Sequence, residues 1–77
     1  MIVAQEELTH PTQPSRLRLR VFRQEKGFLL TEERIGTATV FNTLGVFEDQ
    51  PTAEAHLRER ASELGRQRYR RAAAAPA

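Results

Sequence analysis

The 77-residue sequence is long enough for one small domain, and its 39% hydrophobic and 29% charged residues predict a folded chain. It has no cysteine, which excludes disulfides, cysteine-based zinc sites and thiolate catalysis. The net charge is +2. Residues 1–10 have no basic start or apolar run, and no stretch reaches the length of a membrane span. We therefore expect a cytoplasmic protein without a signal peptide.

The first third of the chain predicts strands. Residues 2–8 suit a short strand, and residues 9–15, which include two prolines, suit a loop. In residues 16–21 arginines alternate with apolar side chains. This period of two predicts a strand with one buried face, and the buried residues are Leu17, Leu19 and Val21.

A hairpin is predicted next. Residues 24–27 suit a turn, in which Gly27 is free to adopt a positive φ, and residues 28–31 suit a second strand. After a bend at residues 35–37, residues 38–41 suit a third strand. Residues 42–45 are consistent with either a turn or a bulge, and residues 46–47 return to extended chain.

A helix should start next, with Asp49 or Gln50 as its cap and Pro51 tolerated in the first turn. Its apolar stripe should pack on the buried face of the first hairpin, and it consists of Ala53, Leu57, Ala61 and Leu64. Gly65 weakens or ends the helix. The predicted fold class is α+β: a small antiparallel sheet with one C-terminal helix on one face, followed by a disordered Ala-rich tail at residues 72–77.

Residues 33–37, with the sequence Glu-Arg-Ile-Gly-Thr, resemble the end of the W-G-R-[IV]-G-T signature of WGR domains. An alternating strand before it, an Ala-rich helix after it and a basic end with a late aromatic are also similar to that family, over residues 2–71. The signature tryptophan falls at Glu32 and the first glycine at Glu33. The resemblance implies a nucleic-acid-binding module, with DNA as the expected partner, and gives a contact role to Arg34 alone.

Two groups of arginines are the strongest binding sites that the chemistry predicts. All basic residues except Lys26 are arginine, which forms bidentate hydrogen bonds with phosphate. The first group, the arginine ladder, consists of Arg16, Arg18 and Arg20. Alternate side chains of a strand are about 6.5–7 Å apart, which suits successive phosphates of a nucleic acid. The alternative is a solvated sheet face paired with glutamates of neighbouring strands, such as Glu32.

The second group lies after the helix and contains Arg66, Arg68, Tyr69 and Arg70. Arginines around an aromatic ring can hold a phosphate backbone and stack a base. The alternative is a solvent-exposed terminus with Tyr69 packed on the core.

Other chemistry is not predicted. The phenylalanines are expected to fill most of the core, and they are Phe22, Phe28, Phe41 and Phe47. Two histidines without an acidic cluster do not form a metal site, and His56 is expected to be exposed. We find no catalytic residues, and we expect neither a cofactor nor enzymatic activity.

The sequence therefore predicts a nucleic-acid-binding module that acts through arginine contacts with phosphate. The alternative is a protein-interaction or regulatory module that dimerises, or binds a partner, through an exposed sheet face, where Leu29 is an apolar candidate. Charge geometry distinguishes them. Arginine groups that share one face favour nucleic acid, whereas interleaved glutamates and a separate apolar patch favour a protein partner.

Overall fold

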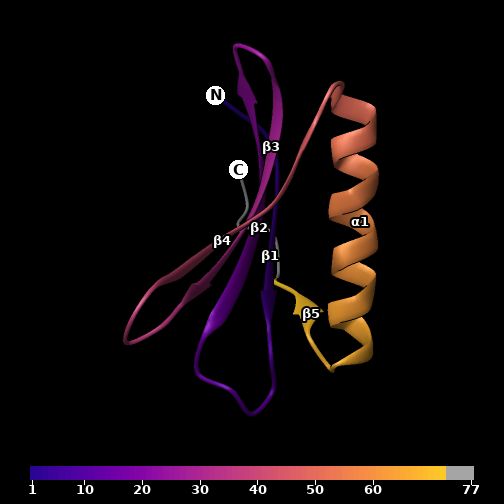
Figure 1. Ribbon diagram of the computed structural model, residues 1–77. Coiled ribbons are helices and arrows are strands. Elements are labelled where there is room, and N and C mark those ends of the chain that lie inside the picture. Colours follow the sequence, from indigo (N-terminus) through magenta and orange to yellow (C-terminus); the bar gives the residue numbers. More distant parts are fainter. Residues whose placement is uncertain (73–77) are drawn as a thin grey trace, which may run out of the picture.

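A computed structural model describes residues 1–72 and shows a five-stranded antiparallel sheet with one helix lying along one face (Figure 1). The strand order is β4-β3-β2-β1-β5. The elements are β1 Ile2–Thr9, β2 Arg16–Gln24, β3 Gly27–Ile35, β4 Val40–Phe47, α1 Gln50–Arg66 and β5 Arg70–Arg71. This confirms the predicted α+β fold class. The predicted tail lies outside the described residues except for Ala72.

The turn between β2 and β3 is confirmed. Gly27 pairs with Gln24 and has a φ of 145°, a conformation that side chains other than glycine rarely adopt. A Cβ atom placed on Gly27 would lie 2.7 Å from the carbonyl oxygen of Phe47 on β4. Glycine is therefore required both for the backbone conformation and for the close approach of β4.

Strand β3 is longer than predicted, because it continues beyond residue 31 through two glutamates and Arg34 to Ile35. Glutamate is depleted in strands, so the sequence pattern stops too early. Both carboxylates have cationic partners: Glu33 pairs with Arg20 of β2, and Glu32 pairs with Arg60 of α1. These ion pairs allow a charged segment to lie in the middle of the sheet.

Strand β4 is continuous from Val40 to Phe47, so the predicted alternative of a turn at residues 42–45 is wrong and the bulge is confirmed. Leu30 pairs with Gly45, whereas the next residue, Thr31, pairs with Thr43. Leu44 is therefore the extra residue of a β-bulge. After the bulge, the alternation of side chains between the two faces of the sheet is shifted by one residue.

Helix α1 begins as predicted. The Asp49 side chain accepts a hydrogen bond of 2.8 Å from the backbone N–H of Thr52, and this bonding lowers the pKa of Asp49 from its ordinary value. The helix ends at Arg66, directly after Gly65. Arg68 then adopts a positive φ of 76°, and the N–H of Tyr69 bonds to the carbonyl of Leu64 at 3.1 Å. This is a Schellman cap in which an arginine occupies the position that glycine prefers.

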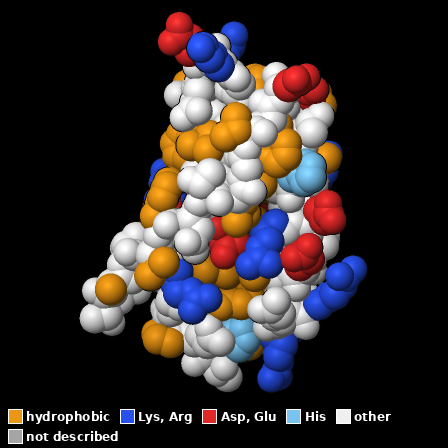
Figure 2. Space-filling model, viewed as in Figure 1, with side chains coloured by type: hydrophobic (Ala, Val, Ile, Leu, Met, Phe, Trp, Pro, Cys, Tyr) orange, Lys and Arg blue, Asp and Glu red, His pale blue; other side chains and the backbone are white. Residues whose placement is uncertain are grey.

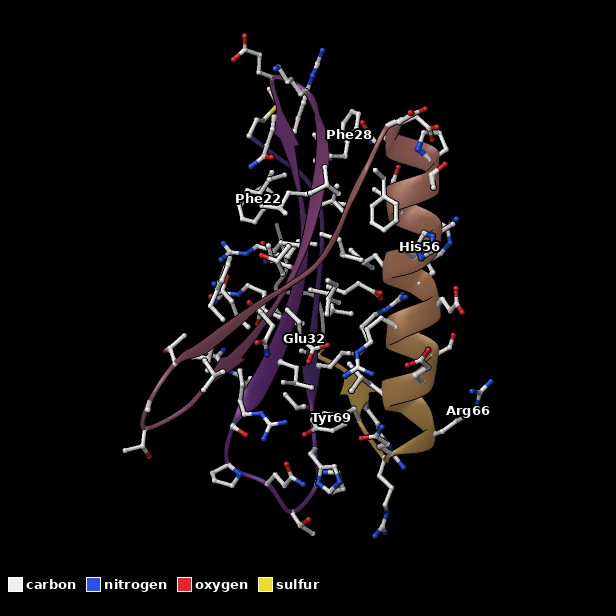
Figure 3. All side chains as sticks on the ribbon, in the orientation of Figure 1. Phe22, Phe28, Glu32, His56, Arg66 and Tyr69 are labelled. Atoms are coloured by element: carbon white, nitrogen blue, oxygen red, sulfur yellow. The ribbon has the colours of Figure 1, made fainter. Side chains whose placement is uncertain are left out.

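The core lies between α1 and the sheet, as predicted for the helix stripe and the buried face of β2. Its buried residues are Leu8, Leu17, Leu19, Val21, Leu30, Ala53, Leu57, Leu64 and Tyr69. Phe28 and Phe47 pack against this cluster, but the expectation that most phenylalanines fill the core is wrong for the other two. Phe41 is 54% exposed, and Phe22 points away from α1 (Figure 3). The aliphatic residues of β2 already fill the single layer under the helix.

Candidate interaction surfaces

The two faces of the sheet differ in what covers them. Alternation along the strands places Leu17, Leu19 and Val21 under α1, and it places the arginine ladder on the opposite face. Within residues 1–72, no helix or strand lies over that opposite face (Figure 1). We call it the open face.

The arginine ladder is interleaved with glutamates on the open face. Arg18 lies between Glu7 and Glu33 in the register, and its Nε donates to Glu7 at 3.2 Å. An oxygen of Glu7 also lies 3.6 Å from Arg16, and Glu33 pairs with Arg20. Arg16 is 51% exposed, but Arg18 and Arg20 are only 25% and 18% exposed. The ladder is thus largely neutralised, as in the second of the two expectations, although its partners are Glu7 and Glu33.

Glu32, which the sequence suggested as a ladder partner, lies on the other face and points toward α1 (Figure 3). Arg60 of α1 donates to its two carboxylate oxygens, from Nε at 2.6 Å and from Nη2 at 3.3 Å. A third bond of 3.1 Å joins Arg60 to Glu63. Hydrogen bonding to Glu32 raises the pKa of Arg60. This ion pair connects α1 to β3, and the Glu32 carboxylate is not exposed for a ligand to contact.

The arginines at the end of the helix and after it are more accessible. Arg66, Arg68 and Arg70 are exposed, and none of them forms an ion pair with another described residue. Arg68 and Arg70 line a surface groove of about 530 Å³ between the β1–β2 loop and the end of α1. Arg71, by contrast, pairs with Glu6. The short strand β5, which the sequence did not predict, places Arg70 and Arg71 at an edge of the sheet.

Tyr69 belongs to the core and is 6% exposed. Its hydroxyl donates a hydrogen bond of 2.9 Å to Gln13, and its ring meets the edge of His10 at 5.0 Å between centroids. Because the side chain is buried in the core cluster, Tyr69 matches the packing alternative.

The register separates Arg34 from the other exposed arginines. Arg34 is exposed on β3, and it occupies the same row of the sheet as Leu17, Leu8 and Arg71. Two strands lie between Arg34 and β5, a separation of about 14 Å. On the open face, Arg16 and Arg70 both neighbour Thr9. The structure therefore brings Arg16 close to the C-terminal group but leaves Arg34 apart.

A row of apolar side chains crosses the open face at the end opposite to the loop of residues 10–15. The register pairs Ile2 with Phe22, Phe22 with Leu29, and Leu29 with Val46, so the row spans four strands. Arg20 lies over the ring of Phe22, 5.1 Å from its centroid. The row ends on the edge strand β4 at Val46, which is 60% exposed. Leu29, expected to be exposed, is half-buried within this row.

Strand β4 carries most of the exposed large apolar side chains: Val40, Phe41, Leu44 and Val46 are between 41% and 60% exposed. Figure 2 shows hydrophobic side chains along the surface that this strand forms. Residues 35–47 contain no charged side chain. The sequence predicted extended chain at residues 38–41 and 46–47 but not this surface. The absence of charge over residues 35–47 is the signal that could have indicated it.

Within residues 1–72, no group of three or more His, Asp or Glu side chains could hold a metal ion, and no helix is long and apolar enough to cross a membrane. Comparisons of the chain with protein-family models, with curated proteins and with solved structures found no match. The resemblance to WGR domains therefore stays a prediction from the sequence.

Proposed function

We propose that this protein is an interaction module whose edge strand β4 accepts a segment of a partner protein. The observation that carries the proposal is the combination of place and composition in β4. It is an edge strand of the sheet, it extends over eight residues, and it has exposed apolar side chains without any charge.

An edge strand has a row of backbone N–H and C=O groups without partners, which form a template for another strand. Proteins usually protect such edges with charges, proline, a β-bulge or a very short strand. Of these devices β4 has only the bulge at Leu44. The other edge of this sheet is formed by β5, which consists only of Arg70 and Arg71, and by the part of β1 that β5 does not cover, residues 2–7. Both parts carry charged side chains, two arginines on β5 and two glutamates on β1. The contrast between the two edges of one sheet supports a binding role for β4.

The charge distribution also favours this function over binding through the ladder. Glu7 and Glu33 already pair with the ladder arginines, and the apolar surface lies on a different strand. A phosphate backbone would have to displace these carboxylates from partly buried arginines. A partner strand at β4 requires no such displacement.

Site-specific photo-crosslinking tests the proposal in cells that produce the protein. A photoreactive residue at Val46 should give discrete protein adducts, and the same residue at Glu59, exposed on α1, is the matched control. Adducts at Val46 should also diminish when Phe41→Lys places a charge on the same edge. Equal labelling at Val46 and Glu59 would contradict the proposal.

A second candidate function is nucleic-acid binding through the C-terminal arginines. It rests on the exposed side chains of Arg66, Arg68 and Arg70, which form no ion pair with residues 1–72 and two of which line the surface groove. Each phosphate contact adds about 0.9 to the magnitude of the salt slope on duplex DNA. Replacing all three residues with Gln should therefore reduce the slope by roughly 2–3 units.

The matched control for this second function is the ladder triple variant, in which Arg16, Arg18 and Arg20 become Gln. Because those arginines are paired with glutamates, this variant should change the slope less than the C-terminal triple variant. Titrations of duplex, nicked and single-stranded DNA at two salt concentrations measure both variants. Absence of binding at the lower salt concentration would exclude this function.

A further inference from the structure

We propose that the segment that pairs with β4 is β4 of a second copy of this chain, so that two sheets join into one. This inference rests on the proposed function of β4 and specifies its partner. The joined sheet would be antiparallel and continuous through both copies, with β5 at each outer edge. A twofold axis would pass through the contact, as in most homodimers.

Charge is the first argument for a second copy. A twofold contact places a surface against itself, so each charged residue near the axis faces the same charge on the other copy. Residues 35–47 carry no charge, and self-pairing of β4 therefore creates no repulsion between its own side chains. The two long ion-paired strands, β2 and β3, lie inside the sheet and stay away from the axis.

The bulge at Leu44 is the second argument. Phe41 pairs with Glu33, and Val46 pairs with Leu29, so both lie on the open face although they are separated by an odd number of positions. In a regular strand they would lie on opposite faces. Because of the extra residue, a twofold axis between Thr43 and Leu44 can place Phe41 of one copy opposite Val46 of the other, with both side chains on the same face.

Self-complementarity follows from that symmetry. An antiparallel contact centred between Thr43 and Leu44 places Phe41 opposite Val46 of the second copy, and Val46 opposite its Phe41. Pairs of an aromatic and a β-branched side chain are favourable across neighbouring strands. The apolar row that ends at Val46 would then continue onto the second copy, which covers two of the exposed apolar side chains of β4, Val46 and Phe41.

Sedimentation of the purified protein tests the mass. From about 1 µM to about 1 mM, a range that spans weak dimerisation, the mass should rise from 8.8 kDa toward twice that value. Val46→Lys should keep the protein monomeric over this range. Ile2→Lys is the matched control, because Ile2 is 44% exposed at the other end of the apolar row, far from the β4 edge. Circular dichroism verifies that both variants are folded.

Cysteine pairs test the register. The chain has no cysteine, so Phe41→Cys and Val46→Cys each introduce a single thiol. Opposite residues of paired strands lie about 4.5–5.5 Å apart at Cα, within reach of a disulfide. A mixture of the two variants should form a mixed disulfide under mild oxidation. Either variant alone should not, because identical positions of the two copies lie roughly 15 Å apart.

The outcomes separate this inference from the proposed function. A monomer at every concentration overturns the second copy as partner, while adducts of Val46 with a different protein would still support β4 as the binding edge. A dimer that Ile2→Lys abolishes and Val46→Lys preserves overturns edge pairing, because the open faces would then stack on each other. Mass doubling together with the mixed disulfide supports the inference.

Discussion

The ion pair between Glu32 and Arg60 makes the energetics of this small domain testable. The Glu32 side chain is 11% exposed and lies between β3 and α1, whereas Arg60 is 31% exposed and also contacts Glu63. Removing the arginine leaves a nearly buried carboxylate without its cation. Removing the carboxylate leaves an arginine that can reach solvent and keeps a second partner. We therefore expect the two single substitutions to have unequal costs.

The expected magnitudes follow from that burial. Arg60→Met removes three charge-assisted hydrogen bonds, two of them to Glu32. We expect a cost of about 2–3 kcal/mol, below the roughly 3–5 kcal/mol of a fully buried pair. Glu32→Leu should cost about 1 kcal/mol or less. The double variant should be within about 1 kcal/mol of the original protein, because an apolar pair can replace an ion pair of similar volume.

Equilibrium unfolding in urea and thermal unfolding measure these costs. A chain of 77 residues has a free energy of unfolding of about 4–11 kcal/mol, so Arg60→Met should leave a folded but weakened domain. Its Tm should fall by about 8–24 °C, at about 4–8 °C for each kcal/mol. Arg58→Met, at an exposed arginine of the same helix, is the control and should change stability by less than about 0.5 kcal/mol.

The stabilising role of this ion pair is refuted if Arg60→Met lowers the free energy of unfolding no more than the Arg58→Met control. It is also refuted if the double variant loses the sum of the two single costs, because independent contributions would show that the residues do not act as a pair.

Four further changes test the fold. Leu57→Ala should cost about 2–5 kcal/mol in chemical unfolding, because Leu57 is 4% exposed in the core; an unchanged midpoint would contradict this core. Gly27→Val should cost more than about 1 kcal/mol because of its positive φ, and a Tm equal to that of the original protein would argue against that strain. Arg68→Gly should stabilise by roughly 0.5–1 kcal/mol, because it relieves a positive φ at the helix cap; a loss of stability would indicate that the arginine side chain matters more. The lowered pKa of Asp49 adds stability that is present above its ordinary pKa of 3.8 and is lost as pH falls through the folded-state value. Asp49→Ala should therefore destabilise at neutral pH and lose that difference in acid, and a difference that is independent of pH would exclude the cap as its source.

Local patterns predicted the elements well wherever one local force dominates. The alternation in residues 16–21 identified β2 and its buried face, because a sheet with one covered face selects every second side chain. Asp49 and Pro51 located the start of α1 within one residue, because capping is a local interaction. The positive φ of Gly27 was readable for the same reason.

Sequence reasoning missed features that depend on long-range partners. The extension of β3 needs Arg20 and Arg60 from two other elements, and strand β5 exists only because β1 has a free edge beside it. The exposure of Phe41 follows from its place on an outer strand. A strand pattern does not state whether its strand is central or at an edge.

The sequence by itself determined the α+β class, the covered face of β2, the helix and its cap, because hydrophobic period and capping act between residues near in the chain. Only the tertiary structure decided which charges are free and which strand is open. Glu7 and Glu33 reach the ladder arginines through pairing of separate strands, and this neutralises the sites that looked most basic in the sequence. The strand order leaves β4 at an edge, so an uncharged segment whose phenylalanines were expected in the core carries most of the exposed large apolar side chains of the described chain.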